Sequence, residues 1–299
     1  MKSLTPGDGS PPLGLPSNHY CRHASPLFFI LGCQRSGTTL MRLVLESHSQ
    51  IRCFDEGHAY TILGSPSLLR DVLEDRPPHQ MIGFKIPRWT EQLCDSVLTD
   101  PGLDVVADNF YQEEPLIFVV RDARDTVCSM VNLKMGESNW LETWGTTILQ
   151  RKIQDSGEFR REFAGDIDSI NTAPGRPVAA AALFWKYKVA SYYRYLDRGF
   201  PVLLVHYERL VQHRFDELKR ITNFLGVDWE DAMLKHFEFQ HPETDEHGLA
   251  VGGTDPSRPI HSESVGQYSS FLRPSETEDI LRIAGDAMER LGYNTGGLG

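Results

Sequence analysis

The chain has 299 residues, 40% of them apolar and 24% charged, which is enough to bury a sizeable core, and its formal net charge at pH 7 is −11. This acidic balance argues against broad binding to nucleic acids or to anionic membranes, because both partners require a basic surface that displaces counterions. No apolar run approaches the roughly 20 residues that span a bilayer, so we expect no membrane span.

The ends and the cysteines suggest how the chain is organised. Residues 1–24 are rich in Pro, Gly and Ser and lack the apolar core of a signal peptide, so we expect a flexible leader. Residues 25–299 contain no evident linker, and we expect a single domain with a helical insert at about 136–195. The cysteines are odd in number and lack the paired spacing of zinc ligands: Cys21, Cys33, Cys53, Cys94 and Cys128. We interpret them as reduced thiols of a cytoplasmic protein.

Short apolar runs predict the strands of a parallel sheet. The first, Leu27 to Leu31, is bounded by Pro26 and Gly32 and reads as a strand buried on both faces. The others are Met81 to Phe84, Leu116 to Val120 and Val202 to Val205. Each is separated from the next by enough chain for one or more helices. This order favours an α/β fold.

Helices are expected between and after these strands. One begins at about Thr38, where apolar residues recur at helical spacing. The others are expected at Val178 to Leu196, Phe215 to Leu225 and Glu276 to Leu291. Between Ala250 and Arg273 the composition shifts to Gly, Ser, Pro, Thr and His, which predicts a long ordered loop. Loops of this length in compact domains are often functional.

The segment Gly32 to Thr39 lies between a predicted strand and a predicted helix. Its two glycines have P-loop spacing, so backbone N–H groups can converge on a phosphate at the helix N-terminus. However, Thr38 occupies the position of the lysine with which NTP-hydrolysing enzymes reach the β- and γ-phosphates, and Arg35 brings a positive charge instead. An ordinary Gly-Ser-Thr turn before a helix is the alternative interpretation.

The run from Gln34 to Leu40 resembles the 5′-phosphosulfate loop of sulfotransferases that use 3′-phosphoadenosine 5′-phosphosulfate (PAPS), and neighbouring residues are similar to the tyrosylprotein branch of that superfamily. The resemblance implies a P-loop NTPase-like three-layer fold with a central parallel sheet flanked by helices. It implies PAPS as co-substrate and no metal. The residues implied to bind the phosphosulfate are Arg35, Ser36, Gly37, Thr38 and Thr39.

The same resemblance implies a 3′-phosphate site made by an Arg after another strand and a Ser eight residues later. Arg121 and Ser129 fit this pattern, since Arg121 closes the run Leu116 to Val120 and Ser129 lies on the helix expected next. A guanidinium and a hydroxyl can bracket one phosphate. A structural salt bridge from Arg121 to Asp122 or Asp125 is the alternative.

Two later residues are carried over from the resemblance. Tyr207 falls in a stretch similar to the family's late strand and Tyr-Glu turn, where the Tyr packs on or bonds to the adenine side of PAPS. A buried structural tyrosine is the alternative. Arg258 falls in the segment Gly253 to Pro259, which is similar to the basic loop over the cofactor, and would reach a phosphate.

Sulfuryl transfer requires a base beside the acceptor hydroxyl and positive charge beside the leaving phosphate. Glu56 follows Arg35 at the offset at which the tyrosylprotein branch has its catalytic Glu, so the resemblance implies Glu56 as base, with Asp55 and His58 as alternatives. Lys85 ends a predicted strand, so its ammonium would point to the same sheet edge as the phosphate loop. Lys85 and Arg35 would stabilise the sulfuryl or leaving oxygens.

The acceptor is expected to be a hydroxyl of a small molecule or a carbohydrate. The stretch Gly57 to Leu63 lacks the arginines with which the tyrosylprotein branch holds an acidic peptide. The pocket is expected from residues 57–80 and 136–195, although their aromatic side chains are also typical of core packing. These are Trp140, Trp144, Phe184, Trp185, Tyr187, Tyr192 and Tyr193.

Two other functions fit the same sequence. A P-loop kinase of a small molecule would share the strand, loop and helix but would need a lysine at position 38 or an equivalent. A non-catalytic nucleotide-binding module would keep the cofactor pocket without the chemistry. A homodimer is left open.

Overall fold

The computed structural model describes residues 26–91, 114–135, 138–139, 141, 145–172, 176–241 and 254–296. The predicted leader, Cys21, Cys94, Trp140 and Trp144 lie outside the described residues.

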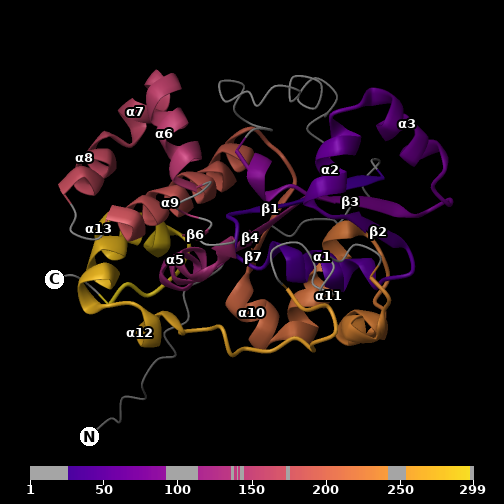
Figure 1. Cartoon of the computed structure of the whole chain (residues 1–299). Coiled ribbons are helices and arrows are strands. Elements are labelled where there is room, and N and C mark those ends of the chain that lie inside the picture. The colour runs from indigo at the N-terminus through magenta and orange to yellow at the C-terminus, as the bar shows by residue number, and fades with distance from the viewer. Residues whose placement is uncertain are drawn as a thin grey trace, which may run out of the picture.

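A five-stranded parallel sheet forms the centre of the molecule (Figure 1). Its strands, in spatial order, are β2 Ile51–Phe54, β3 Met81–Lys85, β1 Leu27–Gly32, β4 Leu116–Val120 and β7 Val202–His206. β1 occupies the middle, with Phe29 opposite Phe84 of β3 and Leu116 of β4. Because all neighbours run parallel, the segments that follow β1, β2, β3 and β4 leave from the same edge of the sheet.

Alternate strand residues enter different cores on the two faces of the sheet. Phe29 and Leu31 enter one core, whereas Phe28 and Ile30 enter the other. The first face is covered by α2 Glu56–Leu63, α5 Ala123–Asn132, α9 Arg176–Asp197 and α13 Pro274–Arg290. The second is covered by α1 Thr38–Glu46, α10 Tyr207–Gln212, α11 Arg214–Leu225 and the 3₁₀ helix η3 Asp231–Glu238. The predicted three-layer α/β fold is therefore confirmed.

Smaller elements surround this core. They are α3 Pro66–Glu74, the 3₁₀ helix η1 Pro87–Trp89, β5 Lys134–Met135, β6 Ser138–Asn139, α6 Thr146–Asp155, α7 Gly157–Glu162, α8 Ala164–Thr172 and α12 Tyr268–Phe271. Helices α6 to α9 fall in the range where we expected an insert. Of these, α9 packs on the sheet and against α5 and α13, so it belongs to the layer over the first face. Pro177 lies in its first turn, where a helix tolerates the missing N–H.

One strand was missed by the sequence analysis. β2 is four residues long, and its second residue, Arg52, is exposed at the edge of the sheet, so it lacks a continuous apolar run. Consequently Asp55 and Glu56 lie at the start of a helix. Asp55 is the N-cap of α2 and Glu56 is its first residue, because β2 delivers the chain directly into that helix.

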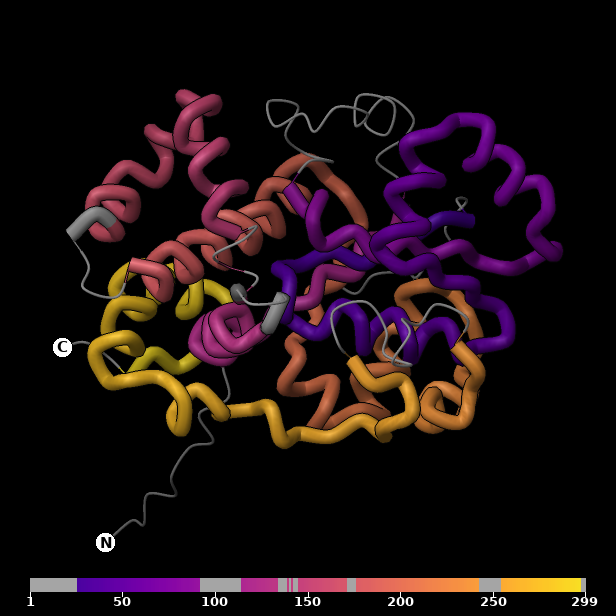
Figure 2. The backbone as a smooth tube through the Cα atoms, viewed as in Figure 1, coloured from indigo at the N-terminus to yellow at the C-terminus, as the bar shows by residue number. Residues whose placement is uncertain are grey.

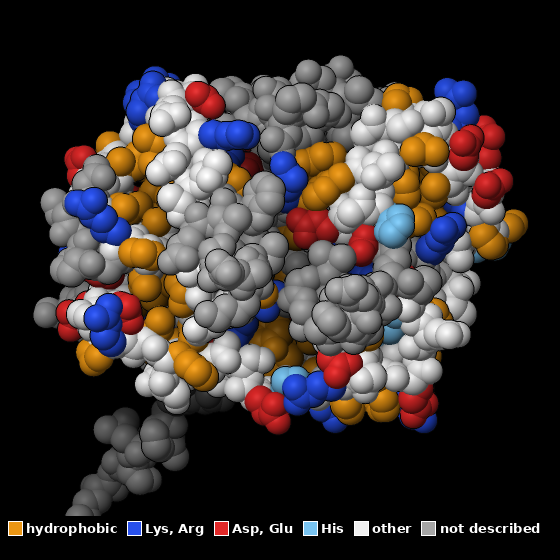
Figure 3. Space-filling view, viewed as in Figure 1, with side chains coloured by type: hydrophobic (Ala, Val, Ile, Leu, Met, Phe, Trp, Pro, Cys, Tyr) orange, Lys and Arg blue, Asp and Glu red, His pale blue; other side chains and the backbone are white. Residues whose placement is uncertain are grey.

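The long loop predicted before Arg273 is ordered over its described part. Residues 254–267, called the strap below, run along the lower edge of the molecule to α12 (Figure 2). None of the helices in the described part of the chain combines the length and apolar character that crossing a bilayer requires. On the face drawn in Figure 3, the described Lys and Arg side chains are scattered among acidic ones.

Candidate active site

The phosphate loop, residues 33–37, connects the central strand β1 to α1. Arg35 and Gly37 both adopt left-handed conformations, with φ of 70° and 96°. A Cβ atom at Gly37 would lie 2.4 Å from Cδ2 of Tyr207, so the close approach of this ring requires glycine. The N-cap of α1 is Gly37, which has no side chain to cap the helix, and the first backbone N–H groups of a helix are suited to bind an anion.

A cavity of about 340 Å³ opens beside this turn. Its walls come from four distant parts of the sequence: the phosphate loop with the start of α1, the segment around α5, the first residue of α10, and the strap. The donor residues proposed from the sequence that line it are Arg35, Gly37, Thr38, Thr39, Arg121, Ser129, Tyr207 and Arg258. Ser36 is the exception, because its side chain is buried within the loop.

Two guanidinium groups meet at this cavity. Arg35 Nε donates to Ser129 Oγ at 3.0 Å, and Arg121 Nη1 donates to the carbonyl oxygen of Arg35 at 3.2 Å. Burial, followed by the charge of Arg121, lowers the pKa of Arg35 to about 10. An anionic ligand would relieve the repulsion between these like charges, so the arrangement favours binding of an anion.

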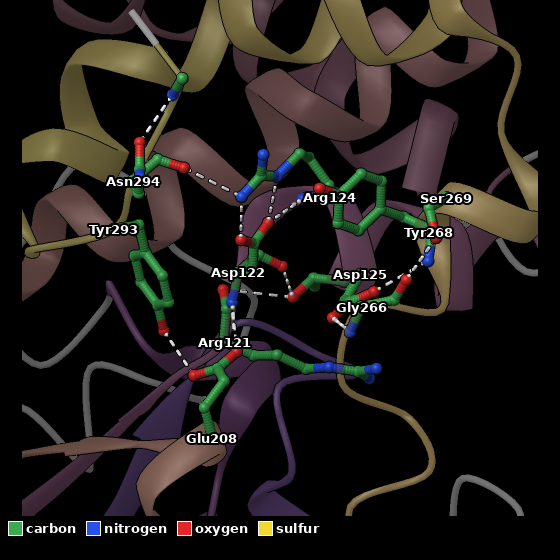
Figure 4. A network of polar contacts seen from close by, with 12 residues as sticks. Arg121, Asp122, Arg124, Asp125, Glu208, Gly266, Tyr268, Ser269, Tyr293 and Asn294 are labelled. Atoms are coloured by element: carbon green, nitrogen blue, oxygen red, sulfur yellow. Dashed lines mark hydrogen bonds and ion pairs between the residues drawn. The ribbon is translucent and has the colours of Figure 1, made fainter.

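The alternative assignment of Arg121 to a structural salt bridge is not what the structure shows (Figure 4). The carboxylate of Asp122 pairs with Arg124 at 2.6 Å. The carboxylate of Asp125 accepts the backbone N–H groups of Gly266 and Tyr268 at 2.7 and 3.0 Å. Both acids are thus used elsewhere, and Arg121 lines the cavity.

The strap is held over the cavity by side chains that sequence reasoning had not assigned to it. Besides the two bonds to Asp125, Ser264 contributes its carbonyl oxygen to Arg121 Nη2 and its hydroxyl to Tyr207 Oη at 3.0 Å. The ring of Tyr207 in turn lies 4.8 Å from the Arg121 guanidinium carbon. Tyr207 therefore joins the phosphate loop, Arg121 and the strap. Arg258 lies at the exposed rim of the cavity, where its Nη2 is 3.1 Å from Glu263 Oε2.

Lys85 connects the phosphate loop to the acidic residues of α2. It is buried, with 1% of its surface exposed, and its Nζ donates to Thr39 Oγ1 at 3.1 Å. The same Nζ lies 3.7 Å from Glu56 Oε2. Burial lowers the pKa of Lys85 below its ordinary value, while the charge of Glu56 opposes that shift. Lys85 thus adds a second cation, from the end of β3, to the positive charge that Arg35 brings to the loop.

The structure distinguishes the three candidates for the base. Asp55 Oδ1 accepts the backbone N–H of His58 at 3.0 Å and lies 3.1 Å from His58 Nδ1, so this carboxylate is used as a helix cap. The His58 side chain is 62% exposed. Glu56 is the one of the three that forms an ion pair with Lys85. Its other oxygen, Oε1, accepts a hydrogen bond from Tyr60, which the sequence analysis did not single out.

Most of the aromatic residues expected in an acceptor pocket belong to the core. Phe184, Trp185 and Tyr187 are buried, and Tyr192 and Tyr193 pack against the same cluster. Core packing, the alternative stated from the sequence, accounts for these described side chains.

The lining of the cavity suits an anionic ligand. Arg121 Nε is a buried polar atom without a hydrogen-bond partner among the described residues, and such an atom is costly unless a ligand satisfies it. Arg35 and Arg121 supply the charge, and the turn at Gly37 brings the backbone close. Within the described residues no group of acids, histidines or cysteines is placed to hold a metal ion.

Comparison with known proteins agrees with this geometry. The family model described as sulfotransferase domain matches residues 25–292. Protein-tyrosine sulfotransferase 2 of Gallus gallus is 25% identical over 303 residues, which cover 90% of this chain and 70% of the relative. Protein-tyrosine sulfotransferase 1 of Danio rerio is 22% identical over 297 residues, which cover 90% of this chain and 72% of the relative. The sulfotransferase domain from the curacin biosynthetic pathway shares the fold, with a TM-score of 0.56 and 17% identity over 89% of this chain and 97% of that one.

Proposed function

This chain belongs to the sulfotransferase family, and on that premise we propose that it transfers the sulfuryl group of PAPS to a phenolic hydroxyl, with Glu56 as the base. The observation that carries the proposal is the chain of contacts from the phosphate loop through Lys85 to Glu56. It places a carboxylate 3.7 Å from an ammonium that is itself bonded to Thr39 of α1. A base and a cation are thereby held on one side of an anion-binding loop.

Each residue then has a defined part in the reaction. When bound, PAPS supplies the sulfuryl group, whose transfer forms an O–S bond to the acceptor and breaks the S–O bond to the 5′-phosphate. Glu56 takes the proton of the acceptor hydroxyl. Lys85 and Arg35 stabilise the negative charge that develops on the leaving phosphate oxygen. Arg121 and Ser129 hold the 3′-phosphate, and Tyr207 orients the nucleotide from beside the loop.

The relatives favour a protein tyrosine as the acceptor. Both named above are protein-tyrosine sulfotransferases, whereas the sequence alone had favoured a small-molecule or carbohydrate hydroxyl. The second candidate, a small phenol, is supported by α2, whose residues after Glu56 include one basic side chain, His58. The phenol group is common to both candidates. The cytoplasmic location, the single-domain organisation and the homodimer stay predictions.

The experiment measures transfer of labelled sulfate from PAPS to two acceptors, a tyrosine peptide with acidic neighbours and a simple phenol such as 4-nitrophenol. We expect transfer to a phenolic acceptor without added magnesium. Glu56→Gln should reduce kcat by about 10²-fold or more, in the range of general acid–base catalysis, while binding of 3′-phosphoadenosine 5′-phosphate persists. Glu74→Gln, which removes an exposed carboxylate on α3, is the matched control.

The outcomes separate the candidates. Transfer to the peptide alone supports a protein acceptor, and transfer to the phenol alone supports a small molecule. Magnesium-dependent phosphate transfer from ATP, with no response to PAPS, would establish the kinase instead. Binding of the nucleotide without transfer to any hydroxyl would leave the non-catalytic module.

A further inference from the structure

Tyr60 lies beside the proposed base in an arrangement that the motifs did not predict. It follows Glu56 by one helical turn on α2, so the two side chains share a face of that helix. Tyr60 Oη donates to Glu56 Oε1 at 2.6 Å. The same phenolic oxygen accepts the backbone N–H of Arg88 at 3.1 Å.

The direction of these two hydrogen bonds is fixed by chemistry. A backbone N–H can only donate, so the oxygen of Tyr60 is the acceptor toward Arg88 and its one proton is committed to Glu56. Burial and the charge of Glu56 raise the pKa of Tyr60 well above its ordinary value. Tyr60 therefore stays protonated, and remains a donor, wherever the carboxylate is ionised.

The ring of Tyr60 is also held in place. Its centroid lies 4.3 Å from that of Trp89, and the Arg88 guanidinium carbon lies 5.9 Å from the ring centre. Arg88 and Trp89 belong to η1, which follows directly after Lys85 at the end of β3. Both oxygens of the Glu56 carboxylate are thus set by one segment: Oε1 through Tyr60 and the Arg88 amide, and Oε2 by the ammonium of Lys85 at 3.7 Å.

We propose that Tyr60 is a positioning residue for sulfuryl transfer: it holds Oε1 of Glu56 and leaves Oε2, the oxygen beside Lys85, to take the proton of the acceptor. The inference rests on the proposed function, because it assigns a partner to the base of that reaction. A glutamate at the first residue of a helix has three rotatable side-chain bonds, and a fixed donor restricts them to one arrangement.

The test is Tyr60→Phe, which keeps the ring on Trp89 and removes the hydroxyl. We expect kcat for sulfuryl transfer to fall roughly ten- to one-hundredfold, the loss typical of one hydrogen bond to a charged group. The KM for PAPS and the Kd for 3′-phosphoadenosine 5′-phosphate should not change, whereas a residue that only stabilises the fold would not produce this split between turnover and binding. Tyr193→Phe is the control, because its ring packs under Arg290 between α9 and α13. It should leave kcat, KM and Kd unchanged.

A double-mutant cycle makes the test independent of folding. If Tyr60 acts through Glu56, adding Tyr60→Phe to Glu56→Gln should cost little further activity in single-turnover measurements. Equal losses of activity from Tyr60→Phe in the wild-type and Glu56→Gln backgrounds would overturn the inference, as would a Tyr60→Phe single variant with wild-type kcat. If the wild-type chain transfers no sulfate at all, the proposed function fails. If the wild-type chain transfers sulfate and the Glu56→Gln variant does not, a Tyr60→Phe variant with unchanged activity overturns only this inference.

Discussion

The proposed donor side and the proposed acceptor side of the site, called the donor side and the acceptor side below, are built in different ways. The donor side draws on the phosphate loop, Arg121, Tyr207 and the strap, which hold one another through backbone carbonyls and amides as well as side chains. On the acceptor side, the described contacts of Glu56 are made by the side chains of Lys85 and Tyr60.

This difference follows from the ligands. A nucleotide donor presents phosphate groups, which a fixed cradle of backbone groups and arginines can bind. An acceptor hydroxyl instead needs a base beside it, which side chains position here. Changes on the donor side should therefore weaken nucleotide binding, and changes on the acceptor side should reduce turnover with binding intact.

The largest effect is expected from Arg121→Met. This substitution removes a guanidinium that contacts the phosphate loop, the strap and Tyr207 together. Because hydrogen bonds to charged groups are worth about 1.5–3 kcal/mol each, the Kd for 3′-phosphoadenosine 5′-phosphate should rise about 10²- to 10³-fold. Titration calorimetry measures it. Arg282→Met, on the exposed surface of α13, is the control and should leave the Kd unchanged. An unchanged Kd in Arg121→Met would contradict the division of the site into a donor side and an acceptor side.

A smaller effect is expected when glycine is replaced in the phosphate loop. Gly37→Ala places a methyl group 2.4 Å from a ring carbon of Tyr207 at a φ of 96°, so it should destabilise the protein by about 1–3 kcal/mol and weaken nucleotide binding. The unfolding temperature without the nucleotide reports the stability, and its rise on adding the nucleotide reports the binding. Gly165→Ala is the matched control, because its new methyl group would meet no atom within 4 Å. If both variants unfold at the wild-type temperature, the close packing of Tyr207 on the loop is wrong.

The fold and the donor side were largely predictable because their signals are local. Buried parallel strands are continuous apolar runs, and the phosphate loop is one short segment between a strand and a helix. β2 was missed because four residues with an exposed Arg52 at a sheet edge give no such run. The two anchors of the strap on Asp125 were also missed, since they join residues more than a hundred positions apart.

The acceptor side resisted prediction for a different physical reason. Asp55, Glu56 and His58 are close in sequence, and only the geometry of the helix cap separates their roles. Tyr60 reaches Arg88 because β2 and β3 pair in parallel and bring α2 beside η1. That contact has no pattern in the sequence, so the partner of the proposed base became visible only in three dimensions.

The smallest effect concerns Lys85, which joins the two sides, and it appears as a pH dependence. Burial lowers the pKa of Lys85, so its ammonium loses a proton at a lower pH than a free lysine would, and the charge beside the leaving oxygen is lost as the pH rises. The value of kcat/KM for PAPS should therefore decline a few-fold on the alkaline side, starting at a lower pH than an unperturbed lysine would give, with a limit of tenfold per pH unit. Lys85→Arg should have a lower kcat/KM at neutral pH but keep its charge as the pH rises, so its decline should begin at a higher pH than that of the wild type. Identical profiles in the two proteins would mean that the ion pair with Glu56 outweighs burial, and Lys85 would then belong to the acceptor side alone.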